Sequence, residues 1–78
     1  MKRKHLEILR AMVALEQEDQ RSLGNRGEFG VKMIGAKLNR NTTWRDMEPM
    51  KELGLVSETP AGGWRLTLYG REEVEKRA

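Results

Sequence analysis

The chain has 78 residues, of which 37% are apolar and 35% charged, a length that gives room for a single domain over residues 1–78 with one hydrophobic core. Because the chain contains no cysteine, disulfides, thiolate–zinc sites and cysteine nucleophiles are excluded. The formal net charge is +3, and the excess lies in residues 19–45, which hold six Lys or Arg residues and two acidic residues. This balance favours an anionic partner.

The first predicted element is a helix over residues 2–18. Its apolar residues recur at spacings of three and four and form a stripe wider than one packing face requires: Leu6, Ile8, Leu9, Met12, Val13 and Leu15. Either this helix lies across the core, or part of it also meets a second subunit. Since a core of this size contributes little net stability, we expect a homodimer. Glu7 and Arg10 interrupt the apolar run, so we expect no targeting or membrane segment and a cytoplasmic protein.

A second, short helix is predicted over residues 31–38, after a polar loop over residues 16–30 in which Glu28 and Phe29 can add a short strand. The buried side of this helix is expected to consist of Val31, Ile34 and Leu38. Gly35 in its middle costs roughly 1 kcal/mol relative to Ala, so we expect another helix to approach closely at that point.

The third helix is predicted to follow a capping cluster of Asn and Thr side chains in residues 39–42 and to run to about Leu53. Its inner side is expected to consist of Thr43, Met47, Met50 and Gly54. Trp44 lies beside that side, so it is expected to be a core or rim residue, with stacking on a base or a partner as the alternative. Pro49 lacks an N–H donor, and the helix should therefore kink or tighten just before it. Gly54 is well placed to end the helix with a positive φ.

Residues 55–58 and 64–68 are predicted to be strands of a hairpin, because the second segment alternates apolar and polar residues and the turn over residues 59–63 contains one Pro and two Gly. Thr67 is then expected to cap a final short helix that ends at Arg77. The expected fold class is therefore α+β, and mostly α.

Two short helices, a tight polar turn, a glycine stop and a hairpin together resemble a winged helix-turn-helix domain of the MarR or PadR type. Residues 50–56 (Met-Lys-Glu-Leu-Gly-Leu-Val) are similar to the end of the family's recognition helix and its first wing strand, and residues 64–72 are similar to its Leu-Thr-x-x-Gly-Arg-Glu stretch after the wing. Residues 42–45 lie where the family's recognition helix begins. The resemblance covers about residues 31–77. It implies a three-helix core with a two-stranded wing and a short C-terminal helix, and a regulator that reads the major groove of double-stranded DNA with the helix at about 40–53.

The match to the family leaves two registers open in the segment from Ile34 to Thr42. If Ile34 is the main core residue of the second helix, the turn is about two residues shorter than the family's. If Leu38 is instead the apolar residue of the turn, Asn39 becomes the cap. The long flanking helices of typical MarR proteins are missing, so a small-molecule effector is not expected.

The candidate DNA contacts lie at the start of the third helix, on the second helix and in the hairpin: Arg40, Asn41, Thr42, Thr43, Arg45, Lys37, Lys32 and Arg65. Arg binds guanine or phosphate, Asn pairs with adenine, and Thr hydroxyls reach phosphate. The alternative for each of them is a capping or solvated surface residue. Trp64 is expected to pack against the first strand, with a contact of the wing as the alternative.

The leading hypothesis is a small transcriptional regulator that binds a palindromic site as a homodimer. One alternative is a winged-helix protein–protein adaptor, which Asp46, Glu48, Glu52 and a wing tip without Lys or Arg favour. Another is an accessory of replication or recombination that binds DNA with little sequence preference. No cofactor is expected, and neither a catalytic arrangement nor a metal site can be assembled around His5, the only histidine, so we do not expect an enzyme.

Overall fold

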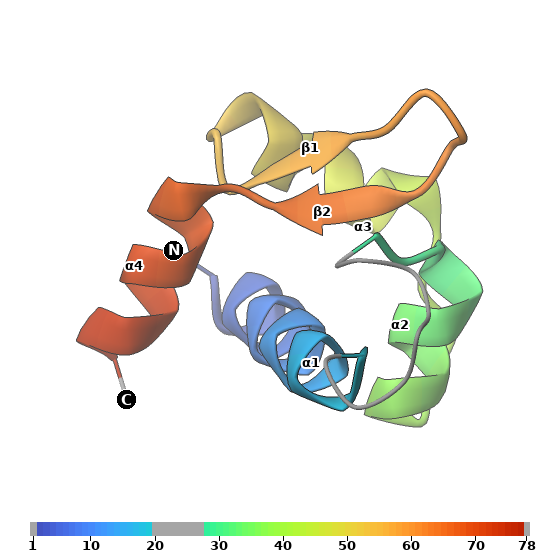
Figure 1. Ribbon diagram of the computed structural model, residues 1–78, viewed down its shortest axis with the longest axis horizontal. Helices are drawn as coiled ribbons and strands as arrows, with labels where there is room; N and C mark the ends of the chain where they lie inside the picture. Colours follow the sequence, from blue (N-terminus) through green and yellow to red (C-terminus); the bar gives the residue numbers. More distant parts are fainter. Residues whose placement is uncertain (1, 20–27, 78) are drawn as a thin grey trace.

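The computed structural model describes residues 2–19 and 28–77. Its elements are three helices, a hairpin and a fourth helix (Figure 1): α1 (Arg3–Asp19), α2 (Val31–Leu38), α3 (Trp44–Glu52), β1 (Val56–Glu58), β2 (Trp64–Leu66) and α4 (Leu68–Lys76). The prediction of an α+β, mostly helical protein is confirmed. Within the described ranges, none of the helices has the length and apolar character needed to cross a membrane.

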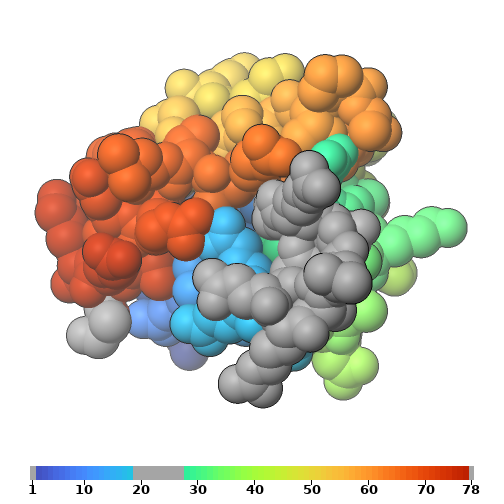
Figure 2. Space-filling model, in the orientation of Figure 1, coloured from blue at the N-terminus to red at the C-terminus, as the bar shows by residue number. Residues whose placement is uncertain are grey.

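The apolar stripe of α1 is used by the core of the same chain. Ile8, Leu9 and Met12 have no exposed surface, and Leu15 is 9% exposed. The helix contacts α2, α4 and β2, and Figure 1 shows it below the hairpin, between α2 and α4. The first explanation for the broad stripe is confirmed, since α1 lies across the core. In the space-filling view, the visible part of α1 lies to the right of α4 and below the hairpin (Figure 2).

The hairpin closes the core from above. Its strands are antiparallel, with Val56 opposite Leu66 and Glu58 opposite Trp64. Trp64 is 2% exposed and lies in the core cluster, which confirms its expected inward packing. The second strand ends at Leu66, earlier than predicted, because Thr67 already caps α4: its hydroxyl oxygen accepts a hydrogen bond from the Gly70 N–H at 3.0 Å.

A further chain segment joins the hairpin. Phe29 forms an isolated antiparallel bridge with Trp64, and its neighbour Glu28 accepts a hydrogen bond from the Thr59 hydroxyl in the hairpin turn. The Thr59 hydroxyl oxygen in turn accepts from the Gly63 N–H at 3.0 Å. The short strand that the sequence allows at this place is thus a single bridge. It fixes the start of α2 against the hairpin.

The close approach expected at Gly35 is present, but its partner is different. A Cβ placed on Gly35 would lie 2.6 Å from the backbone oxygen of Arg40 and 3.2 Å from the backbone nitrogen of Thr42. The expectation of a neighbouring helix was wrong, because the turn that follows α2 folds back onto it. Glycine is required because the turn is so short that its backbone must pass over the helix.

The structure agrees with the first of the two registers, in which Ile34 is the main core residue of the second helix. Ile34 has no exposed surface and is the main core residue of α2, whereas Leu38 is the last residue of the helix and is half-buried. Asn39 follows in the left-handed conformation, with φ 59°, and ends α2. The cap of α3 is Thr43, so the predicted capping cluster in residues 39–42 was placed too early in the chain.

The inner side of α3 has fewer residues than expected, because Thr43 and Gly54 are exposed. Met47 and Met50 have no exposed surface, but Trp44 is 59% exposed, so its expected place in the core or at its rim was wrong. The helix continues through Pro49 to Glu52. Gly54 has φ +78°, which confirms the expected glycine stop.

Candidate nucleic-acid interface

The first turn of α3 is held by a local carboxylate. The backbone N–H of Thr43 donates a hydrogen bond to Oδ2 of Asp46 at 2.9 Å, and Nζ of Lys4 lies 2.5 Å from Oδ1 of the same carboxylate. The hydrogen bond from Lys4, followed by that from the Thr43 amide, lowers the pKa of Asp46. Asp46 therefore stays ionised and fixes the start of the helix. Lys4 neutralises the charge of Asp46, so Asp46 repels phosphate less than an unpaired carboxylate would.

Most of the sequence-predicted contacts are on the surface. Asn41, Thr43 and Arg45 are exposed at the start of α3, and Lys32, Lys37, Arg40 and Arg65 are exposed elsewhere. Thr42 is the exception, because it is only 8% exposed and its hydroxyl lies against the space that Gly35 leaves open. Thr42 is therefore chiefly a packing residue of the turn, with little exposed surface.

The exposed cations fall into two groups. Arg40 and Lys37 are engaged by carboxylates of α1, with Arg40 Nη1 3.0 Å from Glu7 Oε2 and Lys37 Nζ 2.5 Å from Glu18 Oε1. Among the predicted contacts, three cations have no carboxylate partner within the parts of the chain that the structure describes: Lys32, Arg45 and Arg65. Of the predicted cations, these three are the most available to an external anion.

Arg45 and Trp44 form an exposed pair at the start of α3. The Arg45 guanidinium carbon lies 5.6 Å from the centre of the Trp44 ring, within the range of a cation–π contact. The pair presents a planar cation and a large aromatic surface to solvent. Both groups are suited to nucleic acid, since guanidinium binds phosphate or guanine and indole stacks on bases.

A groove of about 550 Å³ runs between α2 and the turn. Its lining residues are Lys32, Gly35, Ala36, Asn39, Arg40, Asn41 and Thr42. Two cations, Lys32 and Arg40, and two amide side chains, Asn39 and Asn41, are among these residues, so the chemistry of the groove suits an anion.

The outer side of α3 limits this surface. Glu48 and Glu52 have no ion pair among the described residues, and Glu52 is exposed. Phosphate would be repelled along this later part of the helix. The favourable part is confined to its first turn.

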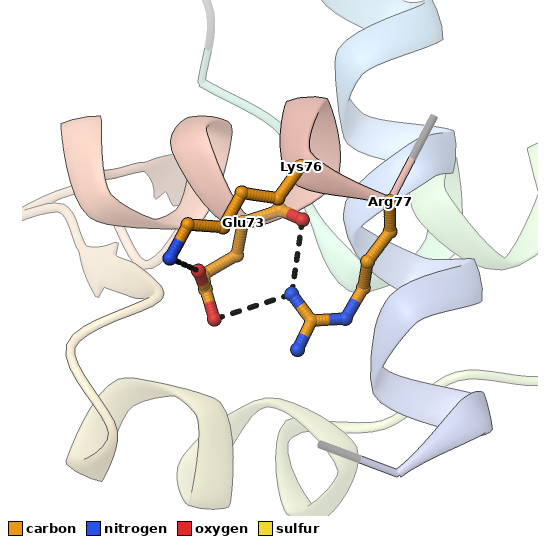
Figure 3. A network of polar contacts seen from close by, with 3 residues as sticks. All are labelled: Glu73, Lys76 and Arg77. Atoms are coloured by element: carbon orange, nitrogen blue, oxygen red, sulfur yellow. Dashed lines mark hydrogen bonds and ion pairs between the residues drawn. The ribbon is translucent and has the colours of Figure 1, made fainter.

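The carboxylates near the C-terminus serve the structure of α4. Figure 3 shows the Glu73 carboxylate between Lys76 and Arg77, each 3.3 Å away. Burial raises the pKa of Glu73, but the contacts with the two cations outweigh it and leave the pKa lowered. No group of three or more metal-ligating side chains occurs in residues 2–19 and 28–77.

Sequence reasoning did not find the partners that α1 supplies. Glu7 and Glu18 are eleven residues apart, which is about three helical turns, so they lie on one side of the helix. This spacing is the signal that the sequence offers. The identity of the two cations that they meet depends on how α1 packs against α2 and the turn.

Comparison of the chain with protein-family models, curated proteins and solved structures finds no significant match.

Proposed function

We propose that this chain is a winged helix-turn-helix protein of the MarR- or PadR-like type that binds double-stranded DNA. The order of elements supports this, with α2 and α3 joined by a tight turn and followed by a hairpin. The bridge between Phe29 and Trp64 adds a third chain segment beside the hairpin, before α2. In such a domain the helix after the turn enters the major groove, and here that part is the exposed first turn of α3.

The observation that carries the proposal is the exposed, carboxylate-free Arg45 in the first turn of α3, beside Trp44. Asn41 and Thr43 are exposed next to it and supply base-pairing and phosphate-binding groups. Lys32 and Arg65 bind phosphates on either side of the base contacts. Arg40 and Lys37 join them after leaving their carboxylate partners.

We further propose that the protein is a transcriptional regulator and binds a palindromic site as a homodimer, with two recognition helices roughly 34 Å apart. Most of the apolar stripe of α1 is buried in the core of the same chain. We therefore assign the contact between subunits to α4. Leu68 and Tyr69 support this, because they are 73% and 50% exposed at the start of that helix.

Fluorescence anisotropy with labelled duplex DNA tests the proposal. Arg45→Ala should weaken binding by about 5- to 100-fold, the range for loss of one base or phosphate contact. Lys51→Ala is the matched control, since Lys51 is on the same helix but lies 3.5 Å from Glu58. Equal binding by the two variants would refute the role of Arg45. Selection from a pool of random duplexes then identifies the site, and selection without enrichment would favour an accessory protein with little sequence preference.

A second candidate function is a protein–protein adaptor. Glu48 and Glu52 on α3 and the 57% exposed Leu53 at its end favour this function, because acidic and apolar groups suit a protein partner better than phosphate. If the wild-type chain fails to bind duplex DNA at about 50 mM salt, where electrostatic binding is strong, the adaptor function replaces DNA binding.

A further inference from the structure

Two residues of α1, Lys4 and Glu7, form ion pairs with charged residues at or just after the turn between α2 and α3. Lys4 of α1 neutralises Asp46 at the start of α3, with 2.5 Å between ammonium and carboxylate. Further along the same helix, Glu7 pairs with the guanidinium of Arg40 at 3.0 Å and, at the longer distance of 3.7 Å, with that of Arg3. α1 thus covers an acid that would repel phosphate and also covers a cation that would attract it.

The ion pair between Glu7 and Arg40 is accessible to a competing anion. Their side chains are 38% and 40% exposed, so a phosphate oxygen can reach the guanidinium from solvent. Arg40 also lines the groove between α2 and the turn, and Lys32 and Asn41 line it as well. A phosphate that enters this groove competes with the Glu7 carboxylate for the guanidinium of Arg40.

We propose that Glu7 is a counter-charge that competes with DNA phosphate for Arg40 and thereby lowers the affinity for DNA of any sequence. This inference rests on the proposed DNA binding. When DNA binds, Arg40 loses its contact with the Glu7 carboxylate and gains one with a phosphate, so its net contribution to affinity is small. Arg45 has no competing carboxylate and keeps its full contribution. Discrimination between sequences therefore depends on Arg45, while Glu7 regulates the contribution of the phosphate backbone.

The test compares Glu7→Gln with Glu72→Gln in binding to a random-sequence duplex of about 20 base pairs at about 50 mM salt. Glu72 is exposed and has no ion pair among the described residues, so its substitution removes the same charge without freeing a cation. Because Glu72 lies on α4, the proposed dimer contact, the two variants are compared only after sedimentation equilibrium has given them the same oligomeric state. Glu7→Gln should bind about two- to five-fold more tightly than Glu72→Gln, the range for one exposed ion pair. Glu7→Asp keeps the charge but shortens the side chain, and should fall between them.

A double-mutant cycle identifies the cation involved. In the Arg40→Gln background, Glu7→Gln should raise affinity no more than Glu72→Gln does. Circular dichroism and thermal unfolding establish that each variant is folded. The inference is overturned if Glu7→Gln and Glu72→Gln bind equally, or if the gain persists without Arg40. If the wild-type chain and all variants fail to bind, DNA binding itself is refuted, which is a different result.

Discussion

Phe29 and Trp64 exchange two backbone hydrogen bonds, with N–O distances of 2.8 Å from Phe29 to Trp64 and 2.7 Å in the reverse direction. Both side chains are 2% exposed, so the bridge lies against the hydrophobic core. It connects the segment before α2 to the returning strand of the hairpin. The position of the hairpin relative to the start of α2, where Lys32 lies, is therefore fixed by backbone pairing and by packing together.

Beside this bridge, the hydrogen bonds of Thr59 predict how the hairpin turn responds when the Thr59 hydroxyl is removed. Thr59→Ala removes the acceptor of the Gly63 N–H and the donor to Glu28, so the Gly63 amide should exchange with solvent faster and stability should fall by about 1 kcal/mol. Thr59→Ser keeps the hydroxyl and should behave as wild type. The Gly62 amide, which donates to the Thr59 backbone oxygen at 2.9 Å, is an internal control. Unchanged exchange at Gly63 would contradict this role of Thr59.

Gly35→Ala should destabilise the protein although alanine favours a helix by about 1 kcal/mol. The new Cβ would lie 2.6 Å from the backbone oxygen of Arg40, and a turn forced away from α2 costs about 1–3 kcal/mol. Urea unfolding measures the change. Gly30→Ala is the control, because a Cβ at this position has no neighbour within 4 Å among the described residues and φ has an ordinary value of −78°. The account of the turn is wrong if the Gly35 variant is as stable as wild type.

Stability should rise as the pH increases from about 5 to about 7. His5 is 8% exposed and its Nδ1 atom has no hydrogen-bond partner within the described part of the chain. Burial lowers the pKa of His5, and the nearby charges of Lys2 and Lys4 lower it further, against the opposing effect of Asp46. Below the ordinary value of 6.5, the unfolded chain takes up a proton that the folded chain resists, so acid favours unfolding.

The chain has no other histidine, so His5 is the main contributor to the slope in the upper part of this pH range, while Asp46 and Glu73, whose pKa values are also lowered, add to it towards the acid end. His5→Leu should remove most of the slope, which for one proton is at most about 1.4 kcal/mol per pH unit. Urea unfolding of both proteins across the range is the measurement. A wild-type stability that is flat from pH 7 to pH 5, or a slope that the variant retains, would contradict the account.

The proposed homodimer depends on α4. Leu68→Glu places a charge on a side chain that is 73% exposed, so it should leave the fold of the monomer intact while it prevents association. Sedimentation equilibrium should give a dimer for the wild-type chain and a monomer for the variant. Met33 on α2, which is 40% exposed, provides a comparison: Met33→Glu should remain dimeric. A monomeric wild-type chain at high concentration would refute the dimer.

Local patterns were sufficient to predict the elements of the fold. The second helix was predicted over residues 31–38 and has these bounds, because its apolar spacing and flanking residues act within a few positions of each other. Gly54 and Thr67 were also predicted in their roles as stop and cap. These features depend on neighbouring residues alone.

Features that depend on packing between distant segments were not predictable in the same way. Trp44 is at helical spacing close to Met47, but α1 and the hairpin already fill the core, and the indole remains outside. The candidate site shows the same limit, since the sequence identifies its cations but not their partners. Arg40 differs from Arg45 only because the packing of α1 brings Glu7 to the turn.

The central claim is that the first turn of α3 binds DNA, and amide chemical shifts recorded during titration with a duplex test it most directly. We predict perturbations at Asn41, Thr43, Arg45, Lys32 and Arg65 that weaken as salt is added. No perturbation at these residues, or perturbation confined to the exposed apolar residues Leu53, Leu68 and Tyr69, would contradict the account.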